Sequence, residues 1–117
     1  MNIERDIIRK FRVTSKYKGF FLLIDAIEIY LEKYNHSSYI SMNDHIYKIL
    51  AEKYETTSYC VEHNIRTLIE RCWKNDRTFM ENIFGCPLKC CPSNREFIDS
   101  VAYYISHPPK ILCESPQ

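Results

Sequence analysis

Glycine is scarce in this chain of 117 residues, which contains only Gly19 and Gly85. The loops that bind dinucleotides and nucleoside triphosphates need several clustered glycines, because their backbone must approach phosphate closely. Two isolated glycines exclude both kinds of loop. The same scarcity argues against a β fold rich in hairpins, since tight hairpin turns need residues with positive φ.

Long apolar runs are also lacking. The longest, residues 20–24, has five residues, whereas a helix that spans a bilayer needs about 20. The first residues alternate between charged and apolar side chains and so lack the apolar core of a signal peptide. We therefore expect a cytoplasmic protein without a membrane partner. In that reducing compartment the six cysteines are expected to be free thiols or metal ligands rather than disulfides.

The chain has 16 basic and 15 acidic side chains. Its net charge therefore does not point to a particular class of partner. The charge is nevertheless uneven along the chain. Residues 1–20 hold six basic and two acidic side chains, and residues 21–55 hold three basic and six acidic ones. Only the first stretch is basic enough to favour contact with an anionic surface.

What the sequence does contain is helical periodicity, with apolar residues spaced three and four apart. It predicts an all-α, compact, bundle-like domain of six helices over residues 1–107, followed by a polar tail at 108–117. The helices are expected at 3–11, 17–34, 42–54, 58–75, 77–84 and 94–106. Ser41 and either Thr57 or Ser58 are predicted N-caps, Ser93 and Glu96 form a predicted capping box, and Gly85 is expected to end a helix with positive φ.

Two of these helices, 42–54 and 58–75, are separated by a break of about three residues. This spacing is typical of a helix-turn-helix, whose second helix enters the major groove of DNA. The inward residues of the first helix are predicted to be Ile46, Ile49, Leu50 and Tyr54. Those of the second are predicted to be Val61, Ile65, Leu68, Ile69 and Cys72.

The opposite face of helix 58–75 carries side chains that suit DNA: Tyr59, Cys60, His63, Arg66, Thr67 and Glu70, with Glu62 on its flank. Arg66 can bind guanine with two hydrogen bonds, and His63 and Thr67 can contact bases or phosphates. Thr57 and Ser58 can hold phosphate at the helix N-terminus, and Lys74 can hold the DNA backbone. The alternative is a plain pair of helices whose polar face is only solvated.

Several motifs resemble one family. They are residues 49–57 (ILAEKYETT), the pairs Val61-Glu62, Ile65-Arg66 and Ile69-Glu70, Trp73, residues 83–85, residues 92–98 and, upstream, residues 18–20. Together they resemble the C-terminal effector domain of the stage-zero sporulation master regulator of endospore-forming bacteria, over roughly residues 7–106. The resemblance implies a six-helix domain without enzymatic activity. It also implies that tandem copies bind double-stranded DNA as a homodimer and contact an RNA polymerase sigma factor.

In that family the effector domain normally follows a phosphoacceptor receiver domain. Met1 here begins just before the effector-like region, so we expect a regulator without a receiver domain in this chain. Either a longer chain has been cut or the protein is a stand-alone member of the family. The residues do not decide between these two.

The matching recognition helix departs from the family at three positions. Glu62 and Arg66 match residues that face DNA in the family. Cys60 and His63 stand where the family has arginines, and Thr67 stands where it has a histidine. We therefore expect weaker DNA binding, a different target, or none. The alternative function is a protein-interaction module that keeps the fold, in which the substituted face or the basic N-terminal stretch binds a partner.

The clustered cysteines raise the question of metal binding and thiol chemistry. Cys86 and Cys90 have the spacing of one zinc-binding pair, and Cys91 lies beside them, but no second pair is evident. We expect no metal and no cofactor. Cys60 and His63 lie one helical turn apart, but a catalytic pair needs an orienting group and an oxyanion site as well. A redox-sensing role for Cys60 stays open.

Overall fold

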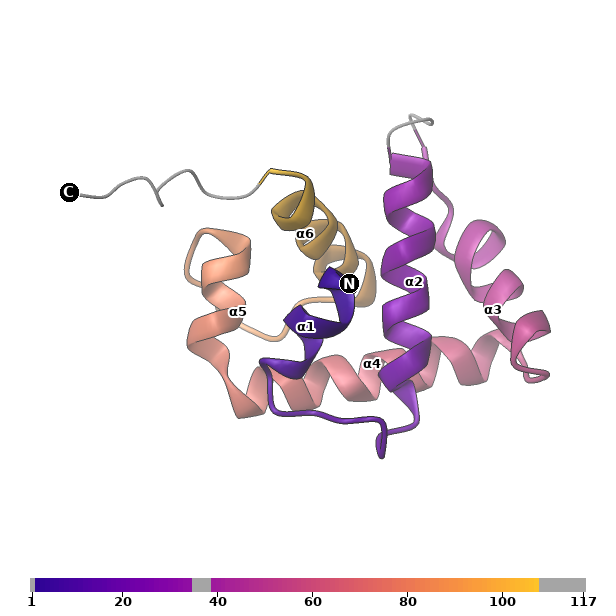
Figure 1. The fold of residues 1–117 in the computed structure, drawn as a ribbon, viewed down its shortest axis with the longest axis horizontal. Coiled ribbons are helices and arrows are strands. Elements are labelled where there is room, and N and C mark those ends of the chain that lie inside the picture. The colour runs from indigo at the N-terminus through magenta and orange to yellow at the C-terminus, as the bar shows by residue number, and fades with distance from the viewer. Residues whose placement is uncertain (1, 35–38, 108–117) are drawn as a thin grey trace.

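The computed structural model describes residues 2–34 and 39–107, and within these ranges it contains only helices and their connections (Figure 1). The elements, in chain order, are α1 (Ile3–Arg9), α2 (Gly19–Tyr34), the π-helical turn η1 (Asn43–Tyr47), α3 (Lys48–Lys53), α4 (Ser58–Asn75), α5 (Arg77–Phe84) and α6 (Asn94–Ser106). The predicted all-α class with six α-helices is confirmed. Over these residues, no helix has the length and apolar character that a membrane span requires.

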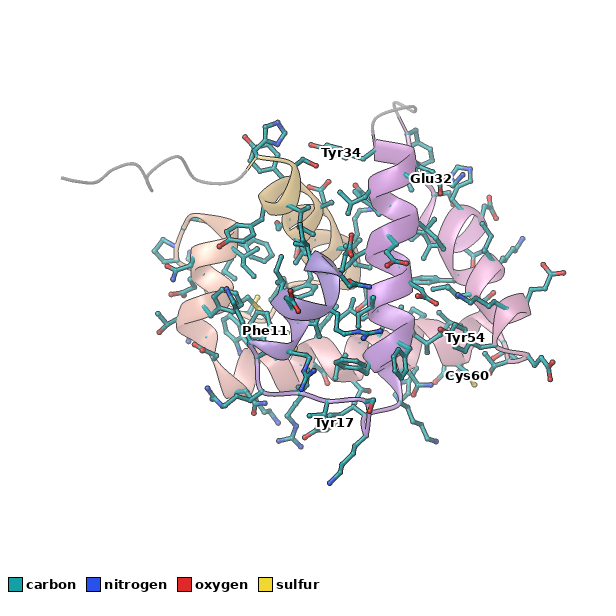
Figure 2. All side chains as sticks on the ribbon, in the orientation of Figure 1. Phe11, Tyr17, Glu32, Tyr34, Tyr54 and Cys60 are labelled. Carbon is teal, nitrogen blue, oxygen red and sulfur yellow. The ribbon has the colours of Figure 1, made fainter. Side chains whose placement is uncertain are left out.

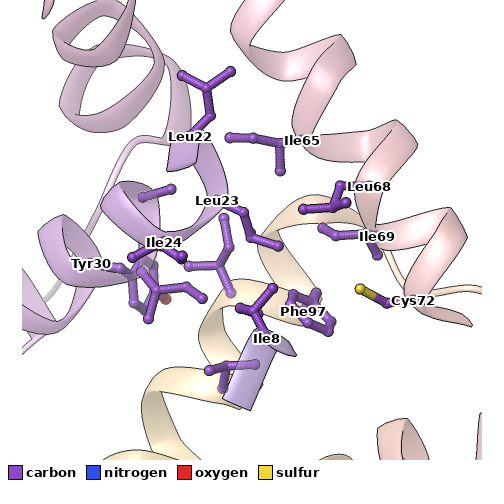
Figure 3. Packing of buried hydrophobic residues seen from close by; sticks show 14 of the residues in the cluster. Ile8, Leu22, Leu23, Ile24, Tyr30, Ile65, Leu68, Ile69, Cys72 and Phe97 are labelled. Atoms are coloured by element: carbon purple, nitrogen blue, oxygen red, sulfur yellow. The ribbon is translucent and has the colours of Figure 1, made fainter. Parts of the chain in front are cut away.

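The core lies where α2 meets α4 and α6. Figure 1 shows α4 running beneath α2, with α3 on one side of α2 and α5 and α6 on the other. Figure 3 shows side chains of four helices converging there: Ile8 of α1; Leu22, Leu23 and Ile24 of α2; Ile65, Leu68, Ile69 and Cys72 of α4; and Phe97 of α6. Burial of this surface is the main stabilising contribution to the fold.

The helix ends follow from local capping. Thr57 accepts a hydrogen bond from the backbone N–H of Cys60, and Ser93 and Glu96 form the reciprocal bonds of a capping box. Gly85 ends α5 with a φ of +77°, as predicted. Of the two predicted caps of α4 the structure has Thr57, and the predicted end of α4, the approximate bounds of α5 and the bounds of α6 are confirmed. α1 ends two residues before its predicted end, because the chain turns sharply at Arg12, which has a φ of +63°.

The helix predicted at 42–54 is not one regular α-helix. It begins with the π-helical turn η1, in which the backbone N–H of Lys48 donates to the carbonyl oxygen of Asn43. Tyr47, the last residue of this turn, is buried together with Ile46, Leu50 and Ala51. Ile49 lies off this buried face and is 44% exposed, and Tyr54 follows the last residue of α3 and is 40% exposed, so the predicted inward positions of these two residues were wrong. Ser41 does cap this segment, since its Oγ accepts from the N–H of Asp44 at 3.1 Å.

Gly19 lets the start of α2 approach α4 closely. A Cβ atom at this position would lie 2.3 Å from the backbone oxygen of Asn64 and 3.1 Å from the Cβ of Leu68. Both neighbours belong to α4, and the nearer one is backbone, which cannot rotate away. The chain just before Gly19 is therefore held alongside α4.

Candidate nucleic-acid interface

The two faces of α4 are sharply divided. Every residue predicted to point inward is buried, and this set comprises Val61, Ile65, Leu68, Ile69 and Cys72. We call the opposite side the exposed face of α4; it comprises Tyr59, Cys60, His63, Arg66, Thr67 and Glu70, all of which are exposed. Among the large apolar side chains of residues 2–34 and 39–107, Tyr59 is the most exposed, at 71%. The periodicity of the sequence therefore predicted correctly which side chains of α4 face outward.

A tight turn presents the N-terminus of α4. Glu55 adopts a left-handed conformation with a φ of +54°. The N–H of Thr56 donates to the carbonyl oxygen of Ala51 at 2.8 Å, and that of Glu55 donates to Glu52 at 3.3 Å. This pair of bonds is the Schellman motif, which satisfies the last carbonyls of α3. The turn fixes where α4 begins relative to α3.

α3 is in turn fixed to α2 by one carboxylate. Oδ2 of Asp25 accepts hydrogen bonds from the hydroxyl of Tyr54 at 2.6 Å and from Nζ of Lys53 at 2.8 Å. Burial and the hydrogen bond to Asp25 raise the pKa of Tyr54 to about 12, so the phenol stays protonated and keeps donating. The helix-turn-helix is thus anchored at its first helix by α2 and at its second by the core.

Arg66 is bound by its own helical neighbours. Its guanidinium donates to Oε2 of Glu62 at 2.8 Å and to Nδ1 of His63 at 3.0 Å. The ring of His63 is stacked nearly parallel to that of Tyr59, with centroids 6.0 Å apart. Because arginine is only a donor, Nδ1 of His63 must be the accepting nitrogen. These two bonds occupy two of the five N–H donors of the Arg66 guanidinium.

Cys60 is an exposed thiol in the first turn of α4. Hydrogen bonds from the side chains of Thr57 and Thr56 lower its pKa, and the positive charge of Lys18 acts in the same direction. Burial has the opposite effect on two other thiols: it raises the pKa of Cys72 to about 12 and also raises that of Cys91. Within the part of the chain that the structure describes, no three potential ligands are placed to hold a metal ion. Cys113 lies outside that part.

Residues 17–19 and the adjacent part of α4 line a groove of about 310 Å³. Three cationic side chains line it, Lys18, Arg71 and Lys74. The exposed face of α4 shares three residues with this groove, His63, Thr67 and Glu70. We call it the basic groove. In Figure 2, Tyr17 lies below the base of α2, and Cys60 lies near the start of α4 on the same side of the molecule.

The predicted DNA-contacting residues are thus spread along the whole length of α4 and its N-cap rather than gathered at one point. Thr57 and Ser58 lie at its start, and Lys74 lies in its last turn, 17 residues after Thr57 and about 25 Å away at 1.5 Å per residue. Sequence reasoning missed Lys18, Asn64 and Arg71. Arg71 continues the spacing of His63 and Thr67, so helical periodicity was a signal that could have found it. Lys18 is adjacent only through the fold.

The comparison with known families agrees with this geometry. The model of the family described as "Sporulation initiation factor Spo0A C terminal" matches residues 4–105. The match covers nearly all of the described fold and every predicted DNA-contacting residue. The resemblance inferred from the sequence motifs is confirmed.

Proposed function

Because this chain belongs to the Spo0A C-terminal family of DNA-binding regulatory domains, which is not a family of enzymes, we propose that it is a sporulation-type transcription regulator that binds double-stranded DNA through the exposed face of α4. The observation that carries the proposal is the division of α4 into a fully buried face and an exposed polar one. The turn at residues 54–57 leaves the N-terminal half of the helix accessible. A major groove about 12 Å wide accepts one such helix.

The proposed contacts follow from the chemistry of each side chain. Arg66 binds guanine once it has released Glu62, and Glu62 can then accept from the amino group of cytosine. Tyr59, Cys60, His63 and Thr67 face the neighbouring bases. Thr57, Ser58 and Lys74 hold the phosphates, the first two through the N-terminal end of the helix.

The finer parts of the proposal have family membership as their support. They are a homodimer on tandem sites, contact with an RNA polymerase sigma factor, and action in the cytoplasm, where bacterial DNA lies. We also treat residues 1–107 as one effector-like domain, with a tail at 108–117 that lies outside the described residues.

The test is a fluorescence-anisotropy titration with duplexes selected from a random pool, at about 50 and 200 mM salt. Wild-type protein should prefer one sequence and lose affinity with salt. Arg66→Ala should weaken binding to the preferred duplex by about 10-fold or more and relax the choice at one base pair. Lys33→Ala, near the far end of α2, is the matched control and should bind as wild type does. Unchanged binding by Arg66→Ala would remove this face from the proposal.

One observation favours the alternative of a protein-interaction module. Tyr59 is largely exposed and stacked on His63, while Glu62 neutralises Arg66. Such a face can bury an aromatic side chain against a protein partner. Binding that is insensitive to salt, together with no DNA affinity at low salt, would favour this function.

A further inference from the structure

The basic groove is open toward solvent and rich in unpaired positive charge. Over the described residues, no carboxylate lies within ion-pair distance of Lys18, Arg71 or Lys74. Arg71 instead lies over the ring of Tyr17, 5.9 Å from its centroid. Glu70 is the one acidic residue in the lining. Three cations against one carboxylate give the groove a net positive charge.

The groove continues the exposed face of α4 without a break. His63 and Thr67 belong to both, and Arg71 and Lys74 follow them one and two turns further along the helix. The charge of Lys18 also contributes to lowering the pKa of Cys60, in the first turn of α4. Lys18 lines the groove together with His63 and Thr67, so it lies beside the helix on the side from which these exposed residues project.

The length of α4 determines which part of DNA would lie against the basic groove of the protein. The distance from Thr57 to Lys74 is about 25 Å, whereas the major groove is about 12 Å wide. A helix whose first half fills the groove must extend past its edge, where the phosphates of one strand lie. The residues that reach this edge are those of the second half, Arg71 and Lys74.

We propose that the basic groove binds the phosphodiester backbone of one DNA strand, with Lys18 and Arg71 as phosphate contacts on either side of it. The proposal rests on the proposed function, because its ligand is the same DNA. It adds a second element, the segment before α2, to an interface otherwise built from α4 and its turn. Gly19 is what allows this element to lie against α4, since a larger residue would force the two apart.

Phosphate contacts have a signature that differs from that of base contacts. Each contact adds about 0.9 to the slope of log affinity against log salt, and it does so on any sequence. For Lys18→Gln and for Arg71→Gln, the ratio of wild-type to variant affinity should therefore fall about 3.5-fold between about 50 and 200 mM salt. The preferred sequence should not change. Lys18→Arg keeps the charge and should retain the wild-type slope, and Lys33→Gln is the control for a lost charge elsewhere.

The outcomes separate the two proposals. A reduced salt slope in both glutamine variants, with folding unchanged by circular dichroism, supports phosphate binding in the basic groove. A wild-type salt slope in both variants, with DNA still bound, overturns the proposal of phosphate binding in the basic groove and leaves the proposed function intact. A change of preferred sequence in Lys18→Gln would also overturn it, because that residue would then contact a base. If wild-type protein binds no DNA at low salt, both proposals fail together.

Discussion

The side chain of Asn94, at the start of α6, donates a hydrogen bond to the backbone carbonyl oxygen of Glu62 in α4, with a distance of 3.1 Å. The same Nδ2 donates to the hydroxyl of Tyr47 in η1 at 3.0 Å. Asn94 is only 7% exposed, and its Oδ1 has no hydrogen-bond partner among the described residues. One buried carboxamide thus joins the last helix to both halves of the helix-turn-helix, at the level of Glu62, one of the residues proposed to contact bases.

Replacing Asn94 with alanine should lower the free energy of unfolding by about 1–3 kcal/mol, because two buried oxygen atoms lose a donor. Urea denaturation followed by circular dichroism measures this. Tyr47→Phe should cost less, since Asn94 would keep its bond to Glu62. The double variant should cost less than the sum of the single ones, as expected for residues in direct contact. Strict additivity would show that the bond to Tyr47 contributes nothing.

Gly19→Ala should destabilise the fold by about 1–3 kcal/mol, the usual range for overpacking. The added Cβ would overlap the backbone of Asn64, so α2 and α4 must separate. Thermal and urea melts give the size of the effect. Gly85→Ala is a suitable comparison, because nothing lies near its Cβ and only its positive φ is strained. Amide chemical shifts of α4 should move in the Gly19 variant alone; their constancy would argue against the close contact.

Glu55→Gly should stabilise the protein by about 1 kcal/mol. Glu55 has a left-handed φ of +54° at the end of α3, where a side chain is strained and glycine is not. Glu52→Gly is the matched control: it removes the same charge from the helix interior and should destabilise by about 0.5–1 kcal/mol. Equal effects of the two changes would mean that charge, not conformation, decides stability here.

His63→Arg should tighten DNA binding by about 10-fold at low salt, since one phosphate or guanine contact contributes about 1–3 kcal/mol. The arginine adds a permanent charge on the exposed face of α4. Asn82→Arg adds the same charge on the exposed side of α5 and should have little effect. Anisotropy titrations of both variants against the duplex selected for the wild type test this. An equal gain in the two would indicate that only net charge matters.

Alkylation should reach its maximal rate at a lower pH for Cys60 than for Cys91. The thiolate is the reactive form, and its pKa is lowered in Cys60 and raised in Cys91. Near neutral pH, Cys60 should therefore react faster. Cys72 is buried with a pKa of about 12, so it should react only on unfolding. Iodoacetamide labelling over a pH series, followed by mass spectrometry of the peptides, gives all three profiles.

Two variants test the cause of that difference. Thr57→Val removes a hydroxyl that stabilises the thiolate and should shift the profile of Cys60 to higher pH, whereas Thr57→Ser should leave it in place. Saturating DNA should slow labelling of Cys60 and leave that of Cys91 unchanged. Full reactivity of Cys60 in the DNA complex would place it outside the interface.

Features that depend on local spacing were predictable from the sequence. The end of α4, the bounds of α6, a cap at Thr57 or Ser58 and the five buried residues of α4 all follow from periodicity and capping chemistry. The π-helical turn was not predictable in this way. Its apolar residues fit a regular helix equally well, and the bond from Asn94 to Tyr47, at the end of this turn, joins residues far apart in the sequence.

The candidate site also has one part that is predictable from the sequence and one part that is not. The exposed side chains of α4 are apparent on a helical wheel. The basic groove is not, because Lys18 and Arg71 are far apart in sequence and meet only where Gly19 brings α2 against α4. The ion pair between Glu62 and Arg66 has recognisable spacing, but the participation of His63 depends on the side-chain conformation.

The division of α4 into two faces has a consequence for how the specificity of such a protein can evolve. Its stability depends on Val61, Ile65, Leu68, Ile69 and Cys72, and none of these projects toward a ligand. The positions between them can therefore be substituted with little effect on folding. A library randomised at positions 59, 60, 63, 66 and 67 should yield mostly folded proteins with many different target preferences. New specificities are then within reach of single substitutions, without any intermediate that fails to fold.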